Sequence, residues 1–291
     1  MFNTTALAAQ MMRMPSMRFL LGGTGSGPKF EDQLNGYHAS AVGSATCNGT
    51  YATFPGGAGD YFTFDASPPT WASTPTAFAT PSPTPGASGW SLNGISVICL
   101  MRVQPGDLQN RTIFHWKNTM DETRWMVRVN SSGMIEFWNQ YFDDSLAVRP
   151  TYLDPTAAPA KTDRFFTIPV DLRPYLCDGK WHLFQFGRGA VTPNPESKRL
   201  MIDFNLVYEK NTGNGVSGFT SPDTSVHIGR ALDTTIAGDS PTPYGNFKGD
   251  MTLFTVRPSD TSRAEMIANA MTAGGAGISL RDLRRLRALR R

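Results

Sequence analysis

The stretch from Cys177 to Arg188, C-D-G-K-W-H-L-F-Q-F-G-R, decides the fold. Asp178-Gly179 is a two-residue turn signal, and the aromatic and branched residues from Trp181 to Phe186 are typical of a half-buried β-strand. Comparable strand patterns recur at residues 51–54, 61–64, 96–103, 112–116, 125–129, 134–138, 199–204, 225–228 and 251–256. Short strands separated by Gly, Pro, Asn and Asp clusters predict an all-β, antiparallel, two-sheet sandwich or jelly roll.

Length and composition favour one main domain with two tails. The chain has 291 residues, and β-sandwiches of about 200 to 250 residues commonly fold as one domain. Hydrophobic residues at 40% suffice for a core, and 28 Gly and 21 Pro supply many turns. We expect an N-terminal arm over residues 1–27, a sandwich over 28–273, and a basic arm or short helix over 274–291.

Charge and cysteine content exclude several protein classes. A net charge of +3 is too small for a nucleic-acid-binding surface over the whole protein. Cys47, Cys99 and Cys177 lack disulfide or zinc spacing, so free thiols are expected. No apolar run approaches the ~18 residues of a membrane span, and arginines interrupt the N-terminal apolar residues in a way that does not fit a signal peptide.

Both tails have an adhesive composition. Apolar residues crowd the first 21 positions, a glycine-rich joint follows at 22–27, and arginines dominate the C-terminus. Between them, Ser262-Arg263-Ala264-Glu265 is a capping box that predicts a helix ending at Gly274-Gly275. We expect the tails to bind other subunits, so that deletion of residues 1–21 leaves a folded sandwich. The residues expected to make these contacts are Phe2, Leu7, Met11, Met12, Phe19, Leu20, Arg281, Arg284, Arg285 and Arg287.

Six short pieces follow one another between residues 32 and 271. They are DQLNGYHA at 32–39, GDYFTF at 59–64, DGKWH at 178–182, VHIGR at 226–230, FKGDM at 247–251, and the helix of 262–271. In this order they resemble the concanavalin A-like lectin/glucanase jelly rolls, in the laminin-G-like branch. The resemblance implies two packed antiparallel sheets and leaves the function open.

The resemblance also raises the question of a calcium site. In calcium-binding members an acidic residue follows the Phe-x-Gly turn, whereas Met251-Thr252 stands at the corresponding positions here. Asp32, Asp60 and Asp250 remain candidate oxygen ligands, but exposed turn aspartates are the favoured interpretation. We therefore expect neither a metal nor another cofactor.

The sequence contains no evident catalytic constellation. A glycosidase of this fold would resemble relatives whose catalytic strand carries Glu-x-Asp-x-x-Glu, and this chain has no such run. Glu136 and Asp203 are isolated carboxylates that alternate with apolar residues, as outward-facing strand positions do. The histidines lack metal-ligand spacing and are expected to be structural: His38, His115, His182 and His227. These patterns predict a protein without enzymatic activity and disfavour a glycoside hydrolase.

Glycan binding is a stronger alternative than catalysis. Aromatic, amide and carboxylate residues cluster where the strand of 134–138 ends, and sugars bind on such combinations. Most tryptophans on strands of this kind belong to the core, which is the competing interpretation. The candidate residues are Trp138, Asn139, Gln140, Tyr141 and Asp143.

The combination of features suggests a virus particle. A recognition fold without an export signal, a disulfide pattern or a catalytic set, but with two adhesive tails, fits a protein that folds in a reducing host cytoplasm and later faces the outside. Modules resembling concanavalin A occur on bacteriophage heads, tails and fibres. We hypothesise a non-enzymatic structural, decoration or tail-associated virion protein whose candidate partners are other virion subunits and host glycans. The alternative is a free lectin-like module.

Overall fold

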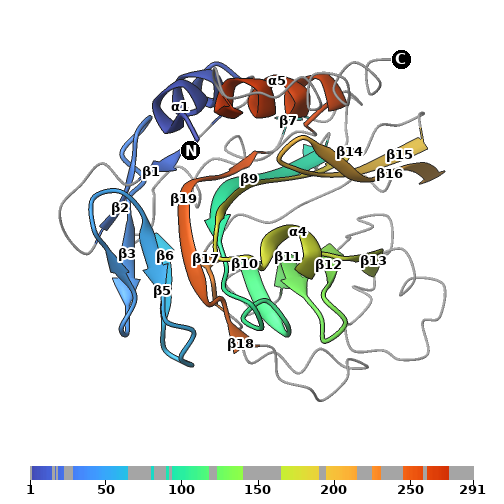
Figure 1. Cartoon of the computed structure of the whole chain (residues 1–291). Helices are drawn as coiled ribbons and strands as arrows, with labels where there is room; N and C mark the ends of the chain where they lie inside the picture. Colours follow the sequence, from blue (N-terminus) through green and yellow to red (C-terminus); the bar gives the residue numbers. More distant parts are fainter. Residues whose placement is uncertain are drawn as a thin grey trace.

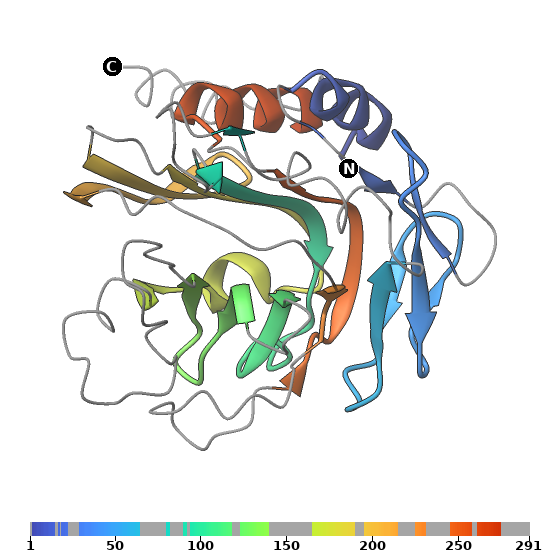
Figure 2. The ribbon, with the colours of Figure 1, turned by 180° about the vertical axis from the view of Figure 1, so that it is seen from behind.

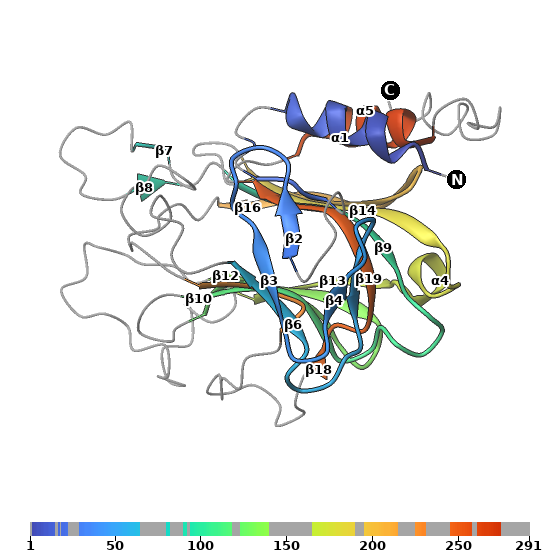
Figure 3. The same cartoon turned by 90° about the vertical axis from the view of Figure 1, so that its left-hand side faces the viewer.

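The predicted two-sheet sandwich is present in the computed structural model of the chain (Figure 1). The structure describes residues 2–14, 17, 19–22, 29–64, 80–81, 90–91, 94–117, 123–139, 165–189, 195–214, 225–230, 245–257 and 261–274. Two antiparallel sheets pack face to face, and two helices lie over the outer face of one of them, as the side view shows (Figure 3).

The first sheet, sheet I, contains most of the strands that precede residue 171. Its order is β2 (Lys29–Asp32), β3 (Ala39–Val42), β6 (Tyr61–Phe64), β17 (Ser225–Ile228), β10 (Arg111–Lys117), β11 (Thr123–Val129), β12 (Met134–Asn139) and β13 (Phe165–Asp171). The short strand β18 (Gly245–Asn246) pairs in parallel with the start of β10. All other neighbours in this sheet are antiparallel.

The second sheet, sheet II, is built around the stretch that opened the sequence argument. Its order is β4 (Thr46–Cys47), β5 (Ala52–Phe54), β19 (Gly249–Arg257), β9 (Gly94–Arg102), β14 (Trp181–Gly189), β15 (Pro195–Ile202) and β16 (Asn205–Asn214). A further pair, β7 (Thr80–Pro81) and β8 (Trp90–Ser91), forms a separate two-stranded sheet.

The turn at Asp178-Gly179 forms as its sequence predicts. Gly179 has a φ of +74°, which glycine adopts without steric cost, and the Asp178 carboxylate accepts a hydrogen bond from the Lys180 N–H at 2.8 Å. A one-turn helix, α4 (Arg173–Leu176), precedes it. Strand β14 then alternates: Phe184 and Phe186 point between the sheets, and Leu183 and Gln185 point to the outer face.

Phenylalanine is the most frequent residue in the core between the sheets. Phe137 of sheet I and Phe186 of sheet II lie with ring centroids 5.2 Å apart, and Phe54 contacts Phe62 at 5.1 Å. The side chains of this inter-sheet core are nearly all below 10% exposed. Each aromatic ring buries a large apolar area, so this core contributes strongly to holding the two sheets together.

The N-terminal segment differs from the expected arm. Residues Thr4–Met12 form helix α1, which lies beside helix α5 (Arg263–Gly274), and both cover the outer face of sheet II (Figure 2). The apolar side chains under the two helices form a second group, the helix-side cluster, with Ile98 and Leu100 of β9. Of the residues expected to bind other subunits, Leu7, Met11 and Leu20 are fully buried in this cluster, and Phe19 is fully buried in the inter-sheet core.

The residues after α1 complete the sandwich. Leu21 in β1 (Leu21–Gly22) pairs with Phe254 of β19 and with Asp32 of β2, so this two-residue strand joins sheet II to sheet I. A bulge in β19 accompanies this contact: Leu253 has a φ of +50° and its side chain enters the helix-side cluster, while Phe254 enters the inter-sheet core. The expectation of contacts with other subunits is therefore wrong for four residues that the chain itself buries: Leu7, Met11, Phe19 and Leu20.

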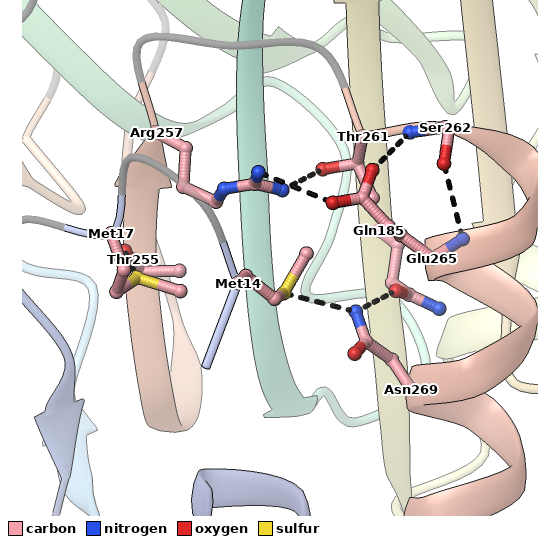
Figure 4. A network of polar contacts seen from close by, with 9 residues as sticks. All are labelled: Met14, Met17, Gln185, Thr255, Arg257, Thr261, Ser262, Glu265 and Asn269. Atoms are coloured by element: carbon pink, nitrogen blue, oxygen red, sulfur yellow. Dashed lines mark hydrogen bonds and ion pairs between the residues drawn. The ribbon is translucent and has the colours of Figure 1, made fainter. Parts of the chain in front are cut away.

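Polar side chains fix helix α5 onto sheet II (Figure 4). The Gln185 amide donates to the Met266 carbonyl oxygen at 2.9 Å and accepts from the Asn269 amide at 2.9 Å, and all three residues are buried. At the start of the helix, Ser262 and Glu265 form the predicted reciprocal capping box. Buried amides that pair with one another favour one placement of the helix over sliding alternatives.

The turn between β15 and β16 lies at Asp203-Phe204, where Asp203 has a φ of +52°. Arg281, Arg284, Arg285 and Arg287 lie outside the described residues. Among the helices that are described, none is long and apolar enough to cross a membrane.

Candidate functional site

The predicted glycan cluster is only partly described. Trp138 and Asn139 are the last residues of β12, where Trp138 pairs with Met126 of β11 and with Phe165 of β13. Gln140, Tyr141 and Asp143 lie outside the described residues. The structure therefore places only the backbone of Trp138 and Asn139, at the end of a strand in sheet I, and the glycan cluster as a whole stays a prediction.

The isolated carboxylate of the same strand is held by the chain. Glu136 is 8% exposed, and its two carboxylate oxygens accept hydrogen bonds from Arg128 at 2.7 Å and from Asn130 at 2.9 Å. The Arg128 guanidinium and the Asn130 amide fix the orientation of both oxygens. These contacts are those of a structural ion pair within the sheet.

Two histidines that are distant in sequence meet on sheet I. His115 of β10 and His227 of β17 occupy directly opposite positions, and both are buried. The Tyr61 ring packs edge-on against His227 at 5.5 Å, and the Arg230 guanidinium lies 4.5 Å from the Tyr61 ring centre. Within the described residues no group of three or more His, Cys, Asp or Glu side chains is placed to hold a metal ion.

Two of the calcium candidates are occupied by backbone donors. The Asp32 carboxylate accepts hydrogen bonds from four N–H groups, those of Leu20, Leu34, Asn35 and Tyr37, at 2.8 to 3.1 Å. Asp60 likewise accepts from two N–H groups, one to each oxygen, at 2.7 and 2.9 Å. Each Asp32 oxygen accepts two N–H groups, so a cation would have to displace them, whereas each Asp60 oxygen accepts only one. The geometry of Asp32 therefore differs from that of a calcium ligand.

The third candidate, Asp250, belongs to a row of side chains on the outer face of sheet II. Thr53 of β5, Asp250 of β19, Arg102 of β9 and Trp181 of β14 stand directly opposite one another on four neighbouring strands. Opposed residues of antiparallel strands project to the same face. We call these four residues, with Tyr51 beside them, the Arg102 row.

Hydrogen bonds hold the polar members of the row in place. The Arg102 Nε and Nη2 atoms each lie 2.8 Å from Asp250 Oδ2, and the Thr53 hydroxyl donates to Asp250 Oδ1 at 2.7 Å. The Asp250 carboxylate raises the pKa of the Arg102 guanidinium, which stays charged. A positive group on this carboxylate excludes a second cation, so Asp250 also differs from a calcium ligand.

The aromatic members pack around the guanidinium. The Arg102 guanidinium carbon lies 5.1 Å from the ring centres of both Tyr51 and Trp181, within the range of cation–π contacts. The two rings meet edge to face, with centroids 5.4 Å apart and an interplanar angle of 64°. Tyr51 is further fixed because its N–H donates to the Asn48 side chain. These contacts make the row rigid before any partner binds.

The row begins where the helices stop covering sheet II. Ile98 and Leu100 of β9 are buried in the helix-side cluster, whereas Arg102, two residues farther along the same face, has a side chain that is 30% exposed. Trp181, Phe204 and Leu206 are partly buried and pack against the edge of the same cluster. The uncovered part of this face therefore combines aromatic, aliphatic and paired polar groups.

A charged cluster lies next to Trp181. Both nitrogens of the His182 ring form hydrogen bonds. Nδ1 lies 2.8 Å from Asp203 Oδ2, and Nε2 lies 2.8 Å from Asp178 Oδ1. Burial alone lowers the pKa of His182, but the hydrogen bonds and charges of the two aspartates outweigh burial and raise it. The hydrogen bond from His182 in turn lowers the pKa of Asp178. Asp203 also accepts from the Leu183 N–H at 2.7 Å, so it too is a structural group.

Sequence reasoning missed both clusters. Asp178 and His182 stand four residues apart, a spacing that indicates contact on a helix, whereas the sequence predicts a turn and a strand here, so the contact was not expected. The Arg102 row had no local signal, because Thr53 and Asp250 are 197 residues apart and meet only through sheet register. The row is the arrangement that best fits a recognition surface.

Comparisons with known proteins place the fold. No protein-family model matches the chain, and no curated protein matches it. Similar solved structures include the binding domain of botulinum neurotoxin serotype D/C (11% identity, TM-score 0.50, covering 86% of this chain and 50% of that one) and the serotype D binding domain (15%, 0.50, 91% and 52%). A structure of botulinum neurotoxin type C is similar at 12% identity and a TM-score of 0.51, covering 86% of this chain and 50% of that one.

These likenesses concern the fold alone. The identities are 15% or lower, and the chain spans about half the length of the solved structures that it matches. They support the β-rich sandwich that the sequence predicts. The laminin-G-like branch and the bacteriophage setting find no support in them and stay predictions.

Proposed function

We propose that the chain is a non-catalytic recognition module that binds its partner through the Arg102 row. The observation that carries this proposal is a partly exposed Tyr, Arg and Trp group that hydrogen bonds and ring contacts hold rigid. These three residue types dominate the energetics of binding surfaces. Rigid groups also lose little conformational freedom when a partner binds.

The absence of catalysis in this proposal is supported by the state of the isolated carboxylates. Glu136 forms an ion pair with Arg128, and Asp203 forms hydrogen bonds with His182 and with the Leu183 N–H. Glycoside hydrolysis requires one carboxyl group to act as an acid and a second to act as a base or nucleophile. In the described part of the chain these two carboxylates have other partners.

Proteins of similar fold supply the partner classes. One similar structure is a botulinum neurotoxin DC binding domain in complex with rat synaptotagmin II, and the type C structure was described for an interaction with two ganglioside molecules. By analogy of fold, a protein or a glycan is the partner class proposed for this chain. The similarity of fold does not locate the binding site, so the position proposed here rests on the geometry of the Arg102 row alone.

Affinity selection from a mixed library of peptides and oligosaccharides, read by mass spectrometry, tests this function. The full chain should retain ligands whose mass is unchanged after incubation, and Tyr51→Ala should weaken retention by about tenfold or more. Tyr61→Ala is the matched control, because it removes the Tyr partner of another arginine, Arg230, on sheet I. Ligands of altered mass would show catalysis, and equal retention by Tyr51→Ala would remove the row from the site.

The cluster at the end of β12 remains the second glycan candidate from the sequence. Trp138→Ala distinguishes the two sites in the same selection. Loss of oligosaccharides on Trp138→Ala, with retention unchanged in Tyr51→Ala, would move the site to sheet I. A free lectin-like module fits that outcome best.

The virus-particle setting is a finer proposal with reduced support. It rested on a recognition fold without an export signal, a disulfide pattern or a catalytic set, together with two adhesive tails. Several apolar side chains of the N-terminal tail are buried inside this chain: Leu7, Met11, Phe19 and Leu20. The arginines of residues 281–291 remain as support from the sequence. Sedimentation of the full-length protein from producing cells tests the setting: it should travel with a particle of many chains, and migration as a single chain would contradict it.

A further inference from the structure

The Arg102 row has features that select among partner classes, and this inference rests on the proposed function. The choice lies between a sugar, an ionic ligand and a polypeptide. Ring accessibility, charge balance and the surrounding side chains each bear on it.

The rings of the row are poorly placed to stack on a sugar. A sugar that stacks on an aromatic residue needs one open ring face. The Arg102 guanidinium lies over the rings of both Tyr51 and Trp181, and Trp181 also packs against the helix-side cluster. The edge-to-face contact between the two rings occupies further surface. The guanidinium therefore covers the face of each ring that it lies on, where a sugar would stack, and its N–H groups suit the carbonyl oxygens of a partner.

The charges of the row and its surroundings are balanced by the chain itself. Arg102 is paired with Asp250, and Lys180 and His182 are paired with Asp178 and Asp203. With His182 protonated, three cationic groups face three carboxylates. An ionic ligand such as a sialylated or sulfated glycan would have to break one of these pairs, which costs the hydrogen bonds that hold it. The complementary partner is therefore neutral.

The surroundings match the anatomy of a protein interface. Half-buried Trp181, Phe204 and Leu206 lie at the edge of the helix-side cluster, and the Lys180 side chain is 78% exposed. Interfaces combine an apolar centre rich in Trp, Tyr and Arg with a polar rim. Four neighbouring strands spaced by about 4.8 Å make the row about 14 Å long, which is wide enough for one face of a helix or for a strand.

We propose that the Arg102 row is the centre of a docking surface for a neutral polypeptide segment that carries aliphatic or aromatic side chains. The guanidinium edge receives backbone carbonyl oxygens of the partner, and the ring edges and Phe204 contact its apolar side chains. Binding of this kind depends little on salt, because exchange of ionic contacts contributes little to it.

Selection from a displayed library of random peptides, together with a glycan array, tests the proposal on the full chain. The enriched peptides should be apolar and uncharged, and their affinity should change less than about twofold between about 50 mM and about 500 mM salt. Trp181→Ala and Arg102→Lys should each weaken binding by about tenfold or more, since lysine keeps the charge and loses the planar fork. Arg230→Lys on sheet I should leave binding unchanged.

Glycans that bind in a manner that depends on Trp181 would overturn the polypeptide inference and leave the recognition function in place. Enrichment of charged peptides with salt-sensitive binding would overturn the neutral character of the partner. Peptide and glycan binding that survive in Trp181→Ala and Arg102→Lys would overturn both the inference and the site. Circular dichroism melting of each variant establishes that it is folded.

Discussion

Asp32 illustrates at the scale of one residue how this molecule uses its carboxylates. Its two oxygens accept the N–H groups of Leu20, Leu34, Asn35 and Tyr37, so a single side chain connects the N-terminal segment to the loop after β2. The residue is 8% exposed. Donors that surround a buried acceptor in this way are left without partners when the acceptor is removed.

Asp32→Ala should therefore lower the free energy of unfolding by about 2 to 4 kcal/mol, because several N–H groups lose their acceptor at once. Asp32→Asn keeps one carbonyl oxygen and should cost less. Urea denaturation of both variants measures the difference. A loss below about 0.5 kcal/mol for Asp32→Ala would show that water replaces the carboxylate.

The same contacts lead to a prediction about calcium. Asp32 accepts four N–H groups, Asp60 accepts two, and Asp250 is paired with Arg102 and Thr53, so added calcium or a chelator should leave the melting temperature unchanged. Differential scanning calorimetry with calcium chloride and with EDTA checks this. An increase in melting temperature that depends on calcium concentration would indicate a site.

His182 predicts how stability changes with pH. Its folded-state pKa is raised, so its protonated ring stabilises the folded state fully below the unfolded-state value of about 6.5. That contribution is lost as pH rises through the higher folded-state pKa. The melting temperature should therefore fall by about 2 to 4 °C more in the wild type than in His182→Gln between pH about 6 and about 9.

Asp178 does not complicate the comparison of the wild type with His182→Gln. The lowered pKa of Asp178 makes its contribution disappear only at acid pH, as pH falls through that value, so it does not act in the neutral window. Parallel pH profiles for the wild type and His182→Gln would contradict the role assigned to the Asp178, His182 and Asp203 cluster.

Helix α1 shows at the scale of an element how the N-terminal segment is bound. The Asn3 side chain caps the helix by accepting the Ala6 N–H, and the Asn3 N–H donates to the Ala273 carbonyl oxygen of α5. One side of α1 is buried in the helix-side cluster, and the other is exposed. Two adjacent methionines lie on these two sides.

Met11→Ala should cost about 2 to 4 kcal/mol of stability, because Met11 is fully buried and its removal leaves a cavity. Met12 is 37% exposed, and Met12→Ala should change stability by no more than about 0.5 kcal/mol. Chemical denaturation of the pair measures the contrast. Equal and small losses of stability in both variants would show that α1 does not pack on sheet II in solution.

At the scale of the whole molecule the chain has three layers: sheet I, sheet II and the helix pair. The N-terminal segment takes part in all three, since α1 is in the helix layer, Phe19 is in the inter-sheet core, and β1 pairs with strands of both sheets. A segment with these positions is an integral part of the fold.

Deletion of residues 1–21 should therefore prevent the formation of a stable sandwich, contrary to what the composition of the tail suggests. The loss exposes the apolar face beneath α1 and removes Phe19 from the core. Solubility and near-ultraviolet circular dichroism of the truncated chain report this. A soluble truncated chain with a native near-ultraviolet spectrum would show that the segment is dispensable.

The sequence by itself determined most of the strands, the turn at Asp178-Gly179 and the capping box at Ser262, because alternation, turn chemistry and helix caps are local properties. It also indicated the fold class, since many short strands with turns between them have few ways to bury their apolar faces. It showed that residues 1–21 carry apolar side chains, but composition does not state which surface buries them.

Only the tertiary structure decided that this surface is sheet II of the same chain, and only sheet register brought Thr53, Asp250, Arg102 and Trp181 into one row. Local patterns carry no information about register between strands that are distant in sequence. Register is fixed when both faces of a sheet find their partners at once, since a shift of one residue would exchange the core face for the outer face. The candidate site is therefore a product of packing, whereas the strands that carry it are products of the sequence.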